Sequence, residues 1–153
     1  MQSFSRFLQL LTLVLWIGGI VFFSFVVAPA LFSILPDPEL AGRVVSRALA
    51  GLHYLGLVCG AVFLVASAFS EGKRQKTMRG LVVLMMLLTA ISQFGIIPQM
   101  QHLRDAVGSI QALPAKDAGR AAFDRLHQIS VILEAIVLSC GVAVVGLISP
   151  DKN

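Results

Sequence analysis

Charged side chains are scarce in this sequence, at 13% of 153 residues, against about 25% in an average soluble domain. The stretches 7–36, 48–70, 80–103 and 126–150 contain a single Asp, Glu, Lys or Arg between them, Glu134. Each stretch is long enough for a transmembrane helix, which needs about 20 mostly apolar residues. The scarcity of charge therefore excludes a soluble domain and predicts an integral membrane protein.

Polar side chains are also too few to give each helix a hydrated face. The runs Leu81–Leu88 and Val131–Val145 are apolar all round, as contact with lipid requires. We expect one all-α domain over residues 1–153, an antiparallel four-helix bundle in the membrane. The predicted spans are residues 6–35, 42–70, 79–104 and 117–148.

Cysteine is nearly absent, which excludes a disulfide framework and a cysteine-based metal site. Cys59 and Cys140 both lie in apolar stretches, and we interpret them as small core residues. The net charge of +4 would suggest nucleic acid as a partner of a soluble protein. Here the basic residues lie at predicted helix ends, where they meet lipid headgroups. We therefore expect the lipid bilayer, and no nucleic acid, as a partner.

The number of basic residues is equal on the two sides of the predicted bundle, so their distribution must decide its orientation. The segment 71–79 (EGKRQKTMR) is predicted as a tight loop that makes the second and third helices neighbours. Its basic residues are dense, whereas those of the opposite side are mixed with acidic residues. The positive-inside rule then favours cytoplasmic termini, in a bacterial inner membrane. A four-helix unit is small for a transport path, so a homo-oligomer is also predicted.

Glu134 is the one formal charge within the four apolar stretches. A carboxylate at that depth costs several kcal/mol unless it is paired or neutralised, so it is expected to face the bundle interior. Arg120, His127 and Glu134 are spaced by seven and share one stripe of the helix. Gln93 of the third helix is expected at the same depth and within hydrogen-bonding reach. Two interpretations stay open: a cation, proton or ligand site, or a protonated glutamate that only fixes helix packing.

Two histidines, His53 and His127, each begin a predicted helix on the same side of the membrane. Facing imidazoles at one depth are typical of a bis-histidine haem or of a metal site. We predict both as metal ligands, with haem b or a transition metal as the cofactor. The alternative is that each histidine only satisfies a backbone neighbour.

The same end of the bundle collects further polar side chains, which predict an open, partly polar mouth there. The opposite end, which holds the termini, is expected to serve topology only. The predicted ligand-binding residues are Arg43, Gln93, Arg104, Arg120 and Glu134.

Several segments resemble one family of small membrane proteins. These segments are Trp16-Ile-Gly-Gly, Phe22-Phe23, Ala28-Pro29-Ala30-Leu31-Phe32, Arg43, Arg47, His53-Tyr54, Pro98 and Phe123-Asp-Arg-Leu-His127-Gln-Ile-Ser130. Together they resemble the family called domain of unknown function 4149, which is similar to the animal transmembrane protein 205. The family is distantly similar to copper-resistance protein D and to HemJ-type membrane oxidases. That similarity implies metal or haem handling, as an analogy of fold.

These observations favour binding or transport over catalysis. We expect a metal ion, haem or a small solute to pass through the polar mouth at the non-cytoplasmic end. Two alternatives stay open. One is a haem-dependent membrane oxidoreductase with His53 and His127 as axial ligands, and the other is a structural partner subunit without a ligand of its own.

Overall fold

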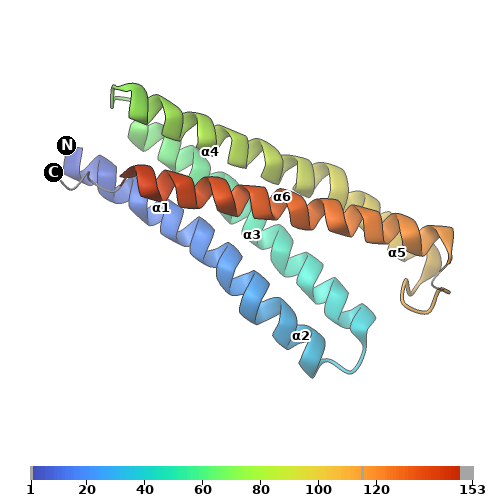
Figure 1. The fold of residues 1–153 in the computed structure, drawn as a ribbon. Helices are drawn as coiled ribbons and strands as arrows, with labels where there is room; N and C mark the ends of the chain where they lie inside the picture. Colours follow the sequence, from blue (N-terminus) through green and yellow to red (C-terminus); the bar gives the residue numbers. More distant parts are fainter. Residues whose placement is uncertain (1, 115, 149–153) are drawn as a thin grey trace.

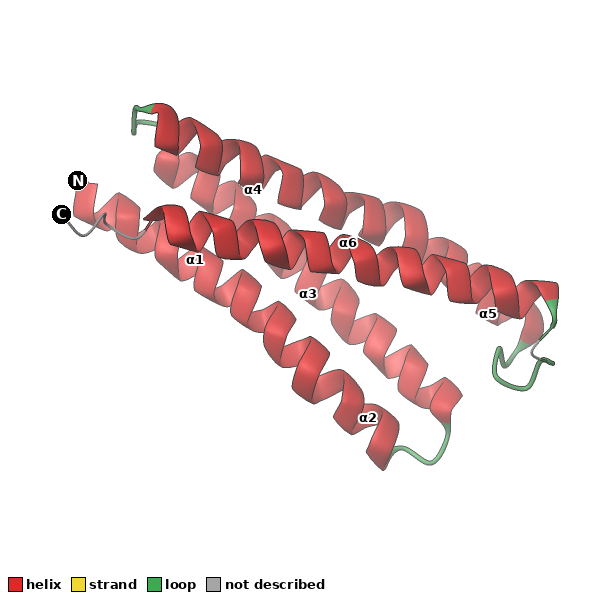
Figure 2. Cartoon of the chain, in the orientation of Figure 1, coloured by secondary structure: helices red, strands yellow, loops and turns green. Residues whose placement is uncertain are grey.

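The structure is a computed structural model that describes residues 2–114 and 116–148. This part of the chain is helical, contains no strand, and forms four helices long and apolar enough to cross a membrane (Figures 1 and 2). The all-α class and the four apolar helices predicted from the sequence are confirmed. The four candidate spans are Ser3–Ile34, Pro38–Ser67, Lys73–Val107 and Ala118–Ile148.

Two of the spans are interrupted by a π-helical turn. The first consists of α1 (Gln2–Phe22), the turn η1 (Phe23–Val27) and α2 (Ala28–Ile34). The third span is interrupted in the same way and consists of α4 (Lys73–Ile91), η2 (Ser92–Ile96) and α5 (Ile97–Val107). The second span is the continuous helix α3 (Pro38–Ser67). The fourth is α6 (Ala118–Ile148). Figure 1 shows both termini at one end of the molecule, and the α2–α3 and α5–α6 connections at the other.

Each π turn ends two residues before a proline. The turn η1 ends at Val27 and precedes Pro29, and η2 ends at Ile96 and precedes Pro98. Proline has no N–H to donate, and its ring clashes with the carbonyl four residues back. A π turn widens the helix at that point, which relieves the clash without ending the span. The sequence predicts a kink at Pro29, and the π turn is the form that the distortion takes.

Two predicted helix boundaries change. The second span starts at Pro38, because the Asp37 side chain caps it by accepting a hydrogen bond from the Glu39 N–H at 2.9 Å. The predicted loop over 71–79 is wrong beyond Gly72, since α4 begins at Lys73. Lys, Arg, Gln and Met are good helix formers, and Gly72 supplies the turn with φ at 120°.

The end of α3 is closed by an arginine from α4. The Arg79 guanidinium donates to the carbonyls of Ser67, Ala68 and Ser70. The last carbonyls of a helix have no partner within it, and a cation there also complements the helix dipole. Arg79 therefore satisfies these groups and fixes the α3–α4 hairpin.

The core forms where glycines let large side chains of other helices sit against the backbone. Trp16 of α1 is 2% exposed and lies on Gly56 and Gly60 of α3. A Cβ added at Gly56 would lie 2.6 Å from Trp16 Cε2. Ile17 of α1 lies in the same way on Gly141 of α6. Small residues let helices approach closely in lipid, where no hydrophobic force drives them together.

The core cluster occupies the part of the bundle in which all four spans pack together. Its members are Leu13, Trp16, Ile20, Cys59, Phe63, Met78, Val82, Met85, Val137, Val144 and Ile148, with Cys140 packed against them. By contrast, η1 and α2 contain no buried residue. In Figure 1, α2 and the start of α3 diverge from α5 and the start of α6. The bundle is therefore tight towards the termini and splayed at the opposite end.

We predict that Gly56→Ala destabilises the protein by about 1–3 kcal/mol, because the new methyl group overlaps the Trp16 ring. Unfolding in detergent micelles can be followed by the fluorescence of Trp16, the one tryptophan of the chain. Gly51→Ala is the matched control on the same helix, since a Cβ there has no neighbour within 4 Å. Equal stability of the two variants would refute the proposed packing.

Candidate functional site

A hydrogen-bonded chain of three side chains crosses the interior of the bundle. His53 of α3 occupies its centre, with Nδ1 at 3.0 Å from Gln93 Oε1 and Nε2 at 3.2 Å from Glu134 Oε2. Gln93 belongs to the turn η2, and Glu134 to α6. Three separate spans therefore contribute to one polar site. Glu134 and Gln93 were predicted at one depth, and they meet through His53 rather than directly.

The members of this chain differ in exposure. The side chains of His53 and Glu134 are 2% and 16% exposed, and Gln93 is buried as well. Glu134 is therefore the more accessible end of the chain, while His53 is enclosed. The π turn contributes to this arrangement, because it places both Ser92 and Gln93 in the buried layer. Such π turns are frequent at functional sites.

The hydrogen-bond partners of His53 define its protonation. Gln93 Oε1 can only accept a hydrogen bond, so Nδ1 of His53 must donate. Nε2 then shares one proton with Glu134: either the acid donates to a neutral imidazole, or an imidazolium donates to the carboxylate. Both forms are neutral overall, which is the state that a low-dielectric environment favours. The site thus holds one proton between two groups that can each accept it.

Further hydroxyl groups lie on the same helices. Ser92 and Ser130 are buried, and their hydroxyl oxygens lie 3.3 Å apart between η2 and α6. Thr89, one helical turn before Gln93, is 1% exposed, and its hydroxyl has no hydrogen-bond partner among the described residues. Buried polar groups normally have a partner, so the Thr89 hydroxyl is an unused binding group near the site.

The structure does not bring His53 and His127 together. His127 is exposed on α6, and it precedes Glu134 by seven residues, or about 10 Å along the helix. His53 lies instead at the level of Glu134, because it stands in the middle of a span that already begins at Pro38. Both ring nitrogens of His53 are engaged in hydrogen bonds.

These positions do not fit a haem held between His53 and His127. The described residues also contain no group of three or more His, Cys, Asp and Glu side chains that could hold a metal ion. A metal ion at this site would find two strong ligand groups, His53 Nε2 and Glu134. Gln93, on the far side of the ring, would orient the imidazole.

Arg104, a predicted ligand-binding residue, takes part in an ion pair at the splayed end of the bundle. Its Nε lies 3.2 Å from Glu39 Oε1, and Nη1 donates to the Ser46 hydroxyl at 3.0 Å. The guanidinium carbon lies 4.9 Å from the centre of the Phe123 ring. Gly42 leaves room for this group, since a Cβ there would lie 2.6 Å from Nη2. Arg104 therefore ties α5 to the start of α3 and to α6.

Glu39, the ion-pair partner of Arg104, was not predicted as a site residue. Its Oε2 accepts a hydrogen bond from the Ile110 N–H at 3.3 Å, which fixes the connection after α5. Ion pairs are visible in a sequence only when their partners are neighbours, and Glu39 and Arg104 lie on different spans. The spacing of Gly42 and Ser46 by four was the available signal, because small residues on one face make room for a long side chain.

Two other predicted ligand residues lie outside the buried chain. Arg43 is exposed and its Nε lies 3.8 Å from Glu39 Oε1. Arg120 donates to the Leu113 carbonyl at 3.0 Å, so it closes the loop before α6. Neither makes a contact with His53 or Glu134 that would join them to one site.

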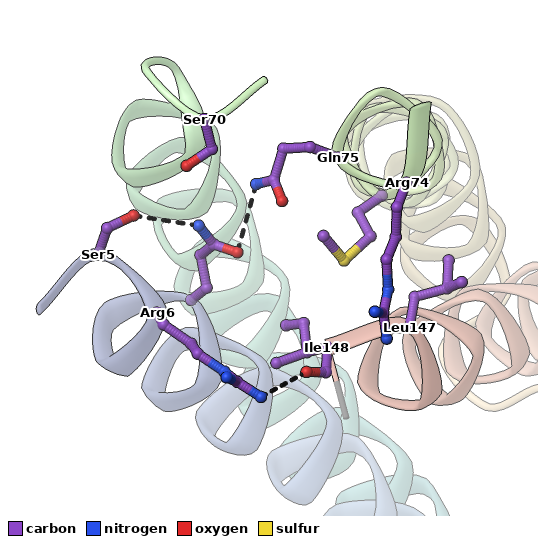
Figure 3. Close-up of a pocket in the computed structure, with 9 residues that line it drawn as sticks. Ser5, Arg6, Ser70, Arg74, Gln75, Leu147 and Ile148 are labelled. Carbon is purple, nitrogen blue, oxygen red and sulfur yellow. Dashed lines mark hydrogen bonds between the residues drawn. The ribbon is translucent and has the colours of Figure 1, made fainter. Parts of the chain in front are cut away.

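A small polar pocket of about 190 Å³ lies at the end that holds the termini (Figure 3). Gln9 links Ser5 and Gln75 by hydrogen bonds of 3.2 and 3.4 Å, and Arg6 donates to the Ile148 carbonyl at 2.8 Å. This end was expected to serve topology only, but it carries a polar network. Gln75 and Gln93 are 18 residues apart on the third span, about 27 Å along the helix. The pocket is therefore distinct from the buried chain.

Taken together, these features define a four-span helical membrane protein with a buried acid–imidazole–amide chain. Residues 11–109 match the model of the family described as a domain of unknown function, DUF4149, and the chain belongs to that family. No curated protein and no solved structure matches the chain. The matched residues include His53 and Gln93 and end before α6, which supplies Glu134. The distant similarity to copper-resistance protein D and HemJ-type proteins stays a prediction.

We predict that Arg104→Gln destabilises the protein by about 3 kcal/mol, because it leaves Glu39 without its close partner in a mostly buried position. Arg43→Gln is the matched control, since Arg43 approaches the same carboxylate but its side chain is 54% exposed. That change should cost no more than about 0.5 kcal/mol. Unfolding in detergent micelles measures both, and similar losses for the two variants would contradict the assignment.

Proposed function

We propose that this protein binds or transports a small cation, a metal ion or a protonated amine, in exchange for a proton. The binding centre is the chain formed by Glu134, His53 and Gln93. The observation that carries the proposal is the 3.2 Å contact between His53 Nε2 and Glu134 Oε2 inside the apolar bundle. Ionisable groups at such a depth are costly to keep, and they commonly mark ion or proton pathways.

Charge balance supports exchange rather than simple binding. The His53–Glu134 pair with its one shared proton is neutral, and loss of that proton leaves one negative charge in the bundle. A monovalent cation restores neutrality, so binding of the cation and release of the proton are coupled. Because Glu134 is the more accessible of the two groups, the incoming ligand meets a carboxylate first. That order favours a cation over an anion.

Two further observations support a ligand at this position. The unpartnered Thr89 hydroxyl, one turn from Gln93, offers an additional oxygen. The splayed end, closed on one side by the Arg104–Glu39 ion pair, offers a less densely packed route to Glu134 than the end occupied by the core cluster. The proposal therefore places the mouth at the end opposite the termini.

The proposed setting is a bacterial inner membrane with both termini in the cytoplasm. The basic residues at the start of α4 support this orientation, because positive charge is retained on the cytoplasmic side. A homo-oligomer is part of the same proposal, since four helices alone enclose little space for a path. The haem-dependent oxidoreductase is not favoured, because His53 is fully engaged and His127 lies on an exposed face.

The proposal predicts proton movement in liposomes that contain the full-length protein and a trapped pH indicator. Inward gradients of Na⁺, K⁺, Cu⁺ and methylammonium are imposed one at a time, and at least one should drive proton efflux above the rate of protein-free liposomes. Glu134→Gln keeps a hydrogen-bonding partner for His53 but cannot release a proton. We expect its rate to be lower by about tenfold or more, which corresponds to about 1.4 kcal/mol.

Asp124→Asn is the matched control for this experiment, because Asp124 is an exposed acid on the same helix. Its rate should equal that of the wild type. If none of the four cations moves protons, or if Glu134→Gln behaves as the wild type, the proposal is wrong. Loss of assembly as the sole defect of Glu134→Leu would then favour a structural partner subunit.

A further inference from the structure

An open groove of about 550 Å³ lies between α5 and α6, away from the buried chain. Its lining residues are Gln99, His102, Leu103, Ala122, Arg125 and Leu126. None of them belongs to the proposed cation site. The groove was not predicted from the sequence, because α5 and α6 contribute to it through residues that are 19 or more positions apart.

The lining combines two kinds of chemistry. Arg125 and His102 are exposed, and neither has a hydrogen-bond or ion-pair partner among the described residues. The amide nitrogen of Gln99 donates to the Gly95 carbonyl at 2.8 Å, which leaves its oxygen as an acceptor. Leu103, Ala122 and Leu126 form the apolar part. The nearby carboxylates of Asp105 and Asp124 do not line the groove, so Arg125 gives its lining a net positive charge.

The groove also has a definite place relative to the membrane. It lies where the third candidate span approaches its end at Val107 and the fourth begins at Ala118. Arginine and histidine at such a boundary meet lipid headgroups, while leucine side chains of the same groove adjoin the hydrocarbon. A free anion would use the charged part of this lining and leave the apolar part without an occupant.

We propose that this groove binds one anionic phospholipid. Its phosphate lies against Arg125 and His102, and an acyl chain lies along Leu103 and Leu126. Charge complementarity supports the headgroup contact, since a guanidinium recognises phosphate through paired hydrogen bonds. The site is independent of the proposed cation exchange, because it shares no residue with Glu134, His53 and Gln93.

Native mass spectrometry of the full-length protein in detergent tests this site with dioleoyl phosphatidylglycerol as the probe. A single lipid adduct should form at lipid concentrations well below those at which further adducts appear. Arg125→Gln should weaken it by about tenfold, the effect of one lost charge-assisted hydrogen bond. Leu126→Gln should weaken the adduct as well, because it removes an apolar contact to the acyl chain. Glycerol phosphate, a headgroup without acyl chains, should bind more weakly than the lipid and should be insensitive to Leu126→Gln. His102→Gln should have a smaller effect, because a neutral amide still donates to phosphate.

Arg47→Gln is the matched control, since Arg47 is an exposed arginine at the same end of the bundle and does not line the groove. The Arg47→Gln variant should bind the lipid with the same affinity as the wild type. Equal weakening by Arg47→Gln and Arg125→Gln would mean general charge attraction and would overturn the site. Equal binding of glycerol phosphate, or of dioleoyl phosphatidylcholine, would overturn the assignment to an anionic phospholipid.

Discussion

The structure depends on one constraint: a polar side chain inside a membrane bundle must find its partner within the protein. His53 meets this constraint because both of its ring nitrogens form hydrogen bonds, Nδ1 with Gln93 and Nε2 with Glu134. The two contacts join three of the four spans at one level. They also hold a single proton in a neutral arrangement, so the group that stabilises the bundle is also one that can exchange a proton.

The rest of the fold brings these three spans to the required distance. Trp16 lies against Gly56 and Gly60, so α1 and α3 approach closely at the level next to His53. The π turn before Pro98 carries Gln93 into the interior without ending the third span. Arg104 and Glu39 then hold the splayed end together from outside the core. The apolar core cluster therefore lies towards the termini, whereas the opposite end, which lacks such a core, is held by the Arg104–Glu39 contacts.

Much of this could be predicted from the sequence, for identifiable reasons. The spans follow from apolar length, and the inward direction of Glu134 follows from the cost of exposing a carboxylate to lipid. The partner of Glu134 could not be predicted, because it depends on the depth of His53, and that depth changed once Pro38 proved to begin the span. The helical start of α4 was missed for a similar reason, since a dense cluster of charge resembles a loop but is composed of good helix formers.

The most direct test of the central claim is the ¹⁵N NMR spectrum of the histidine rings in the full-length protein, compared with that of Glu134→Gln. We expect His53 to show a protonated, hydrogen-bonded Nδ1 and an Nε2 resonance displaced by a shared proton. In Glu134→Gln the Nε2 resonance should move to that of a neutral acceptor, while the exposed His127 stays unchanged. A His53 spectrum that matches His127, or one unaffected by Glu134→Gln, would contradict the account.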